Sequence, residues 1–159
     1  MDAEALERTS AEEISNLTRR ATGATYHAEG LSKDELAFIE RVIRIAPNCV
    51  AEAARNPHQH LVVSILDGRL AGFVIATVHA KTNRELDWLM VDPAFHGGGI
   101  ASPLMCAGMA WLGKDQAMWL NVVRHNQRAI QFYRKHGFEI DPEAVCAHVM
   151  PHVIMKRGS

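Results

Sequence analysis

Hydrophobic and polar positions alternate at helical spacing near the start of the chain. Ile14 and Leu17 stand among charged and small residues, and Ser10 followed by Glu13 is a capping-box pattern. Because such a pair satisfies the first free N–H groups of a helix, the pattern predicts a helix that begins near Ser10. A small, polar loop is expected over residues 22–30.

A second helix is predicted from Ser32, which again has a glutamate three residues later, at Glu35. Apolar positions then recur at helical intervals as far as Ala46. Pro47 lacks the backbone N–H that would continue the helical ladder. We therefore expect the helix to be interrupted there and a short helical turn to follow as far as Arg55.

The pattern then changes to apolar runs typical of strands. Residues 61–66 and 70–78 are two such runs, separated by the dipeptide Asp67-Gly68. Asp-Gly between apolar runs is a strong hairpin signal, because glycine tolerates the positive φ of a tight turn. A third strand is predicted over residues 85–91, where it ends just before an Asp-Pro pair.

The second half of the chain alternates between helix and strand signals. We expect a helix over 100–112, a strand over 118–123, a helix over 127–136, and apolar segments near 138 and over 145–155. This order predicts an α+β fold. Since no internal repeat or linker is visible, residues 1–159 are expected to form a single domain.

Composition narrows the kinds of partner. Hydrophobic residues make up 48% and charged residues 22%, and the net charge of -1 leaves no broad basic face for nucleic acid or an anionic membrane. The 3 cysteines are an odd number without a paired motif, and His58-x-His60 lacks a third ligand, so no metal is expected. With an acidic N-terminus and no long apolar stretch, a cytoplasmic location is expected.

Three consecutive glycines, Gly97 to Gly99, stand between the third strand and the next helix. Glycines let successive backbone N–H groups converge on an anion, and the helix adds its free first-turn donors and the positive end of its dipole. No Gly-Lys-Ser/Thr follows, and Ser102 occupies a position where a dinucleotide fingerprint needs Gly or Ala. The turn therefore predicts a phosphate site of another kind, unless it is only a flexible connection.

The segment around this turn reads Leu89-x-Val91-x-Pro93-x-x-His96-Gly97-Gly98-Gly99-Ile100-Ala101. It resembles motif A of the Gcn5-related N-acetyltransferases, the GNAT superfamily, which is written R/Q-x-x-G-x-G/A. The motif positions fall on His96, Gly99 and Ala101, with His96 where Arg or Gln is usual. In that family the turn holds the pyrophosphate of acetyl-CoA mainly through backbone amides.

A second segment, residues 120–138, resembles the family's other core motif, a strand ending in L-x-V followed by N-x-x-A-I-x-F-Y-x-K-x-G-F. Asn126, Ala129 and Tyr133 share one helix face by their spacing, and Gly137 suits the end of that helix. Without the family, Asn126 could be a plain helix cap and Tyr133 a core tyrosine.

The resemblance implies the GNAT fold, a mixed, mostly antiparallel sheet flanked by helices, and an acetyl-CoA-dependent N-acetyltransferase. Such an enzyme moves the acetyl group to a primary amine of a small molecule or a protein by direct attack through a tetrahedral intermediate. Dimers are common in the family, although the sequence does not indicate a dimer interface. The helical N-terminus is atypical, because family members open with a strand, unless residues 22–27 hide a short extended piece.

The resemblance also implies roles for individual residues. Tyr133 would protonate the departing thiolate, and Glu85 or Asp87, two residues apart on one strand, would take the amine proton. A bulge near Met90 and Val91 would free an amide for the oxyanion. The expected cofactor-binding residues are Met90, Val91, His96, Gly97, Gly98, Gly99, Ile100, Ala101, Ser102, Asn126, Ala129 and Tyr133. The expected acceptor-binding residues are Tyr26, His27, His79 and His152.

Two alternatives to an enzyme remain open at this point. A non-catalytic acyl-CoA-binding or regulatory domain would keep the glycine turn and lack a base. A plain scaffold or dimerisation module would not bind acetyl-CoA at all.

Overall fold

The computed structural model describes residues 10–25 and 30–158. A six-stranded sheet has the order β1-β2-β3-β4-β6-β5. Every neighbouring pair is antiparallel except β3 and β4. The strands are β1 (Gln59–Leu66), β2 (Arg69–Ala80), β3 (Asn83–Val91), β4 (Met118–Val123), β5 (Glu139–Ile140) and β6 (His152–Arg157). This mixed, mostly antiparallel sheet confirms the expected fold class.

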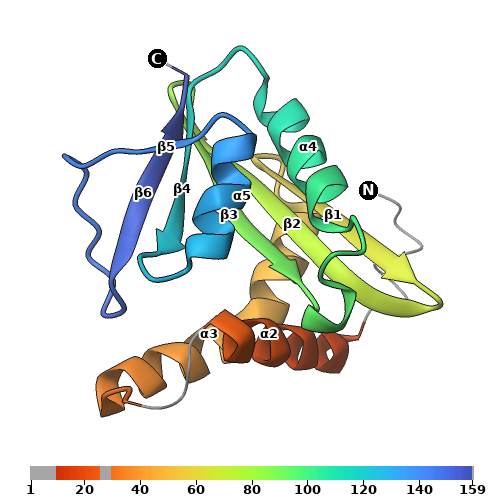
Figure 1. Cartoon of the computed structure of the whole chain (residues 1–159). Coiled ribbons are helices and arrows are strands. Elements are labelled where there is room, and N and C mark those ends of the chain that lie inside the picture. The colour runs from red at the N-terminus through yellow and green to blue at the C-terminus, as the bar shows by residue number, and fades with distance from the viewer. Residues whose placement is uncertain (1–9, 26–29, 159) are drawn as a thin grey trace.

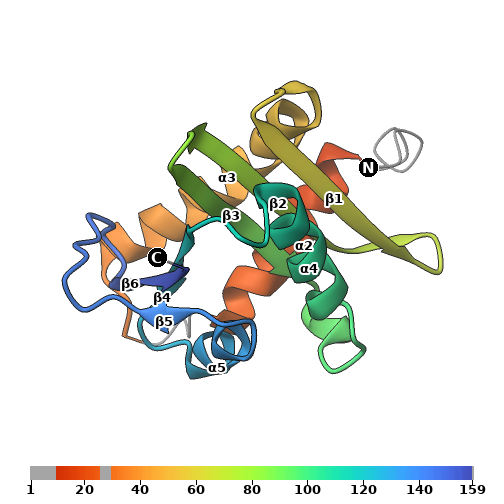
Figure 2. The same ribbon diagram turned by 90° about the horizontal axis from the view of Figure 1, so that it is seen from above.

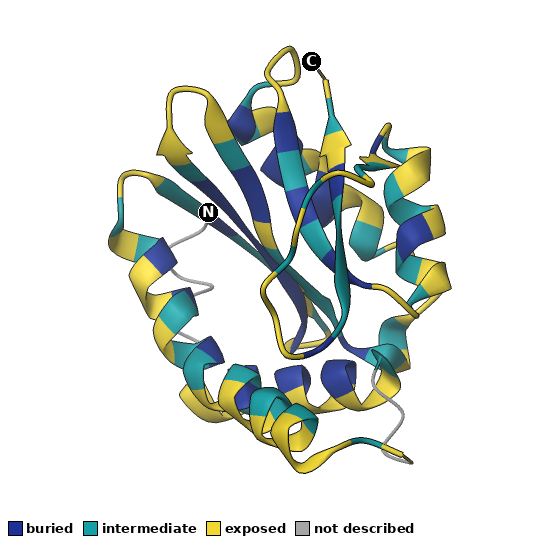
Figure 3. Ribbon diagram, turned by 90° about the vertical axis from the view of Figure 1, so that its left-hand side faces the viewer, coloured by how far each residue is buried: buried dark blue, intermediate teal, exposed yellow. Residues whose placement is uncertain are grey.

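Helices cover both faces of the sheet (Figure 1). They are α2 (Ala11–Thr25), α3 (Lys33–Arg55), α4 (Ala101–Leu112) and α5 (Gln127–Lys135), with a short 3-10 helix, η1 (Pro93–Phe95). One core joins α4 and α5 to the sheet and includes Met105, and a second joins α2 and α3 to the other face and includes Leu17. The buried positions of α2 and α3 lie on the side toward the strands (Figure 3).

The helical N-terminus is confirmed for the described residues. Ser10 and Glu13 form the expected reciprocal capping box at the start of α2. The loop expected from residue 22, and the extended piece considered for the same segment, are wrong over residues 22–25, which are helical. Ala21 and Thr22 are buried, and α2 packs against α3 and the sheet, so tertiary packing favours helix there over the local glycine signal. Tyr26 and His27 lie outside the described residues.

Pro47 does not interrupt the second helix, because α3 runs through it from Lys33 to Arg55. A proline removes only one hydrogen bond of a helix, the one its own N–H would make to the carbonyl four residues earlier. Ala46 and Val50, on either side of it, are buried in the core with α2. This packing offsets the local cost, and the helix bends as it passes behind the sheet (Figure 1).

The strands follow the expectations closely, including the hairpin, where Asp67 and Gly68 both have positive φ. The exception is the apolar segment over residues 145–155. Only its last part is strand, since β6 begins at His152. Val145 is 89% exposed, so apolar character there reflects a surface loop.

The sheet forks between β3 and β4. These parallel strands pair at a single position, Glu85 opposite Trp119, and then diverge. Seen from above, β1, β2 and β3 form one group and β4, β6 and β5 another (Figure 2). The fork places the end of β3 and the glycine turn on one side and the start of α5 on the other.

Candidate active site

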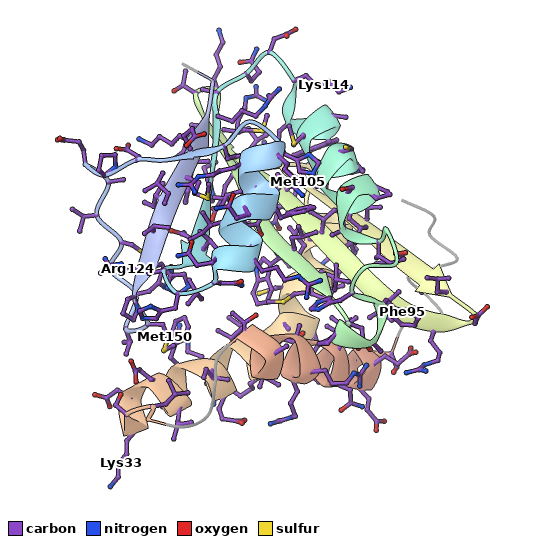
Figure 4. The ribbon with its side chains drawn as sticks, viewed as in Figure 1. Lys33, Phe95, Met105, Lys114, Arg124 and Met150 are labelled. Atoms are coloured by element: carbon purple, nitrogen blue, oxygen red, sulfur yellow. The ribbon has the colours of Figure 1, made fainter. Side chains whose placement is uncertain are left out.

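The glycine turn lies between η1 and α4, below the first turn of α4 and close to Phe95 (Figure 4). Gly97 and Gly99 have φ of 79° and 75°, a region that favours glycine. Inside the turn only the Gly98 N–H is used, donating to the Phe95 carbonyl at 3.0 Å. The turn is therefore shaped by its own backbone.

Free donors remain at this turn. Within residues 10–25 and 30–158, no backbone carbonyl accepts from the N–H groups of Gly97, Gly99 or Ile100. Ile100 is the N-cap of α4 and supplies no side-chain cap, and the first turn of α4 carries no acidic residue. Free N–H groups at an uncapped helix start, without a competing carboxylate, suit a phosphate.

His96, at the start of the turn, contacts the second motif. The Arg128 guanidinium of α5 donates from Nη1 to His96 Nδ1 over 2.8 Å, so this ring nitrogen is unprotonated. Burial, together with the Arg128 charge, lowers the pKa of His96. No carboxylate pairs with Arg128 in the described part of the chain. A guanidinium therefore stands beside the turn, where the histidine itself carries no charge.

An ion pair between half-exposed Arg20 and buried Asp92 fastens the turn to α2. Arg20 donates from Nε and Nη2 to Asp92 Oδ2, at 3.0 and 2.7 Å, and Asp92 Oδ1 accepts the Ala94 N–H at 3.0 Å. Burial alone would raise the pKa of Asp92, but these hydrogen bonds hold it below its usual value. The carboxylate thus caps η1 and fixes where the glycine turn begins.

On α5, Asn126 is the helix N-cap, its Oδ1 accepting the Ala129 N–H at 3.1 Å. The cap interpretation is thus correct, and the Asn126 amide nitrogen has no hydrogen-bond partner among the described residues. Gly137 follows the helix with a φ of 87°, as expected. Tyr133 packs against Phe132 and Phe138, and burial raises its pKa to about 12. No described residue bonds its hydroxyl, which leaves that O–H free to donate.

The bulge of β3 is not at Met90 and Val91, as expected, but at Asp87. Ile75 pairs with Trp88 and the next residue of β2 pairs with Leu86, so Asp87 is the extra residue. Near the end of β3, Asp92 N–H donates to a β2 carbonyl at 2.8 Å. Alternation along an antiparallel pair then turns the N–H of Met90 toward β2 and that of Val91 into the fork. Divergence of β4, not a bulge, frees the Val91 amide.

Two carboxylates meet on the face of β3 that looks toward α3. Glu85 Oε2 lies 2.7 Å from His79 Nε2, and Asp87 Oδ2 accepts the Thr77 hydroxyl at 3.2 Å. Both partners come from β2, in which His79 is the extra residue at a second register shift, between Val78 and Ala80. The expectation that Glu85 and Asp87 face the same side agrees with these contacts.

The charge of Asp87 shifts the ionisation of Glu85. Burial and then the Asp87 charge raise the pKa of Glu85 to about 7, against a smaller lowering by His79. Burial also raises the pKa of Asp87, and the Thr77 hydrogen bond opposes this. Gln59 donates to the Thr77 hydroxyl at 3.1 Å, while its own Oε1 is buried without a partner. A cleft of about 390 Å³ opens beside Asp87, between α3 and the sheet.

The expected acceptor residues are not all together. His79 stacks on Trp119 near the start of β4, whereas His152 lies opposite Val123 at the other end of that strand. Trp119 and Val123 are four positions apart along β4, which corresponds to roughly 13 Å. His152 packs with His148 and with Phe38 of α3, beside the end of the molecule where Arg124 and Met150 lie (Figure 4). Burial lowers the pKa of His152.

Several residues of the site could not be identified from the sequence. Arg128 lies inside the second motif, but nothing local indicates a contact 32 residues back along the chain. Thr77 and Gln59 read only as strand residues, and Arg20 as a surface charge on a helix. Their roles depend on strand register and helix docking. The described residues contain no group of three or more potential metal ligands, and none of the described helices is both long and apolar enough to cross a membrane.

Comparison with known proteins agrees with this geometry. Residues 13–138 match the sequence profile of the Acetyltransferase (GNAT) family. An uncharacterized N-acetyltransferase of Mycobacterium bovis is 34% identical over 93 residues, which cover 57% of this chain and 60% of that protein. A mycothiol acetyltransferase of Salinispora tropica is 37% identical over 79 residues, covering 45% of this chain and 25% of that protein. The match therefore spans less than two thirds of these relatives.

Solved structures share the fold. The PaiA N-acetyltransferase of Thermoplasma acidophilum, determined in complex with coenzyme A, superposes with a TM-score of 0.74 at 22% identity, over 94% of this chain and 92% of that one. Aminoglycoside 6'-acetyltransferase type Ii gives a TM-score of 0.66 at 19% identity, over 93% and 88%. The chain therefore has the fold of these acetyltransferases. Because the family profile covers most of its length, this chain belongs to the GNAT acetyltransferase family.

Proposed function

We propose that this protein is an acetyl-CoA-dependent N-acetyltransferase that transfers the acetyl group to a primary amine of a small molecule or a protein. One observation carries the proposal. Glu85, a buried carboxylate, stands at the only paired position of β3 and β4, at the head of the fork. The uncapped glycine turn follows the other end of the same strand. Glu85, the proposed base, and the proposed anion site thus lie at the two ends of β3, beside the fork between β3 and β4.

The cofactor side consists mainly of backbone donors. We assign the phosphates to the free N–H groups of the turn and the first turn of α4, those of residue 97 and residues 99–102. The free amide nitrogen of Asn126 and the outward N–H of Val91 would contact the rest of the cofactor along the fork, with Ala129 beside them. Met90, whose N–H turns toward β2, would contribute packing only. These donors fit an anionic ligand, and the thioester would supply the activated acetyl group.

Arg128 completes this assignment. Where the family motif has Arg or Gln, this chain has His96, held unprotonated at Nδ1 by Arg128. The guanidinium is the cation nearest that motif position, and arginine suits phosphate well because it donates in a planar fork. Arg128 would therefore supply the positive charge that the motif otherwise lacks.

The proton transfers are divided between two residues. A general base works best with a pKa close to the working pH, and the Glu85 pKa of about 7 meets that condition. The charge of Asp87 helps to raise the pKa of Glu85, so Glu85 is a better candidate for the general base than Asp87. Tyr133 stays protonated over the whole physiological range because its pKa is about 12. Its unbonded hydroxyl would donate the proton that the departing thiolate needs.

The test measures release of the coenzyme A thiol from acetyl-CoA with a panel of primary amines, beside acetyl-CoA binding by calorimetry. Amine-dependent release is expected. Glu85→Gln should lower kcat/KM by about 100-fold or more, in the usual range for a general base, with the acetyl-CoA Kd unchanged. Tight binding of acetyl-CoA without release for any amine would instead identify a non-catalytic acyl-CoA-binding domain.

A further inference from the structure

To act again as a base, Glu85 must release the proton that it takes from the amine. Its side chain is only 11% exposed, so a proton taken from an amine has little direct access to water. His79 touches the carboxylate at 2.7 Å through Nε2, and its own side chain is 41% exposed. An imidazole that joins a buried carboxylate to the surface can pass a proton, because it can bind one at one nitrogen and release another from the second.

The His79 ring is held in place for this contact. It stacks on Trp119 with ring centroids 6.2 Å apart and an interplanar angle of 22°. Trp119 is in turn fixed by its Nε1–H, which donates to Asn83 Oδ1 at 2.7 Å. The stack comes from the same paired position that opens the fork, since Trp119 lies opposite Glu85. Nδ1 of His79 has no hydrogen-bond partner among the described residues.

The other neighbours of Glu85 offer no comparable route. Asp87 is occupied by the Thr77 hydroxyl, which in turn accepts from Gln59, so that chain ends in the sheet. The nearby charged side chains of other elements are paired with one another. Glu52 pairs with Arg55 on α3, beside the cleft. Asp141 pairs with Lys156, the β6 residue opposite Trp119. Among the described residues, His79 is the one titratable side chain in hydrogen-bond contact with Glu85.

We propose that His79 is the proton exit of this site, receiving from Glu85 the proton that Glu85 takes from the acceptor amine and releasing one to water. The amine N–H bond breaks as an O–H bond forms on Glu85. That proton moves to Nε2 of His79, and the resulting imidazolium loses its Nδ1 proton to solvent. Glu85 returns to the carboxylate. The ring tautomer is restored when Nε2 leaves Glu85 and exchanges its proton with water, and no electrons are transferred. The inference rests on the proposed function.

The experiment compares pH profiles of kcat/KM for the wild type, His79→Gln and His79→Ala, using an amine that the wild type acetylates. His79→Ala is expected to lose about 100-fold in kcat, the lower end of the range for one proton-transfer group. Added imidazole should restore at least about 5-fold, because the exposed site can admit it. His79→Gln keeps a donor for Glu85 but cannot relay a proton, so it should stay slow, and its acidic limb, which reports ionisation of Glu85, should move to higher pH. His58→Ala removes an exposed histidine whose side chain makes no hydrogen bond in the described part of the chain, and it should match the wild type with or without imidazole.

The outcomes separate the two proposals. If the wild type releases no coenzyme A with any amine, the proposed function fails and the proton exit fails with it. If the wild type is active and His79→Gln retains its kcat, the proton exit alone is wrong. Loss of activity in His79→Ala without imidazole rescue would assign His79 a structural role, which also overturns the proposal. Carboxyl NMR of Glu85 in His79→Gln provides a readout without turnover, because removing His79 should raise the Glu85 pKa.

Discussion

The two sides of the fork hold their polar groups by different means. On the cofactor side, the donors are backbone N–H groups of the glycine turn and of the start of α4, shaped by local φ values. On the opposite side, the polar groups are the side chains of Glu85 and Asp87, placed by pairing of β3 with β2 and by a bulge. A backbone site tolerates side-chain change, whereas the carboxylate pair depends on strand register. Substitutions on the cofactor side and on the carboxylate side should therefore change different properties of the protein.

The largest expected effect comes from placing a charge in the glycine turn. Gly98→Glu puts a carboxylate among the donors, and repulsion of the phosphates should weaken acetyl-CoA binding by more than about 100-fold in calorimetry. Gly98→Ala controls for bulk, since its Cβ would lie 3.0 Å from the Phe95 carbonyl oxygen, and should cost far less. Gly23→Glu, an exposed position of α2, controls for charge and should bind normally. Retained affinity in Gly98→Glu would remove the phosphates from this turn.

Tyr133→Phe should show the next largest effect, on chemistry and not on binding. Deleting one hydroxyl that donates to the leaving thiolate should lower kcat by about 100-fold while the acetyl-CoA Kd stays within about twofold. Because the pKa of Tyr133 is about 12, the loss should be uniform between pH 6 and 9. Steady-state kinetics with calorimetry separates the two quantities, and an unchanged kcat would exclude Tyr133 from proton transfer.

This division also explains what the sequence could predict. The glycine turn, the N-cap at Asn126 and the left-handed Gly137 are local features, so a few consecutive residues determine them and each was expected. The position of the bulge was not. It depends on how β2 and β3 align over their whole length, and the apolar residues around Met90 fit either register.

Long-range side-chain contacts were the least predictable. Arg128 meets His96 across the fork, and Arg20 meets Asp92 from a helix 72 residues earlier. Each is an ordinary surface arginine by local pattern. The continuous α3 teaches the same lesson, because burial on both sides of Pro47 outweighed its local preference. Local rules thus described the cofactor side well, and tertiary packing determined the rest.

A smaller effect tests the charge at the turn. Arg128→Ala should weaken acetyl-CoA binding by about 5- to 20-fold, the range of one charge-assisted contact to a phosphate, and should leave kcat nearly unchanged. Arg134→Ala, on the same helix and paired with Glu139 at the surface, is the matched control and should bind like the wild type. A stronger salt dependence in the wild type than in Arg128→Ala is also expected. Equal Kd values for the two variants would contradict the assignment.

The smallest effect concerns stability and has a different pH dependence on each side. The pKa of Glu85 is raised from its ordinary 4.5 to about 7, so its stabilising contribution is complete below pH 4.5 and is lost as the pH rises through 7. Glu85→Gln should therefore stabilise the fold by on the order of 1 to 2 kcal/mol more at pH 8 than at pH 5.5, a melting shift of roughly 2–6 °C.

Asp92→Asn is the matched variant on the cofactor side. The pKa of Asp92 is held below its usual value despite burial, so its contribution is complete above that value and is lost only on acidification. The substitution should therefore destabilise the protein about equally at pH 5.5 and pH 8, because it leaves Arg20 without its buried partner. Thermal melts of both variants at the two pH values suffice. A flat response in Glu85→Gln would mean that Glu85 is already ionised at pH 5.5, which would remove its main qualification as the base.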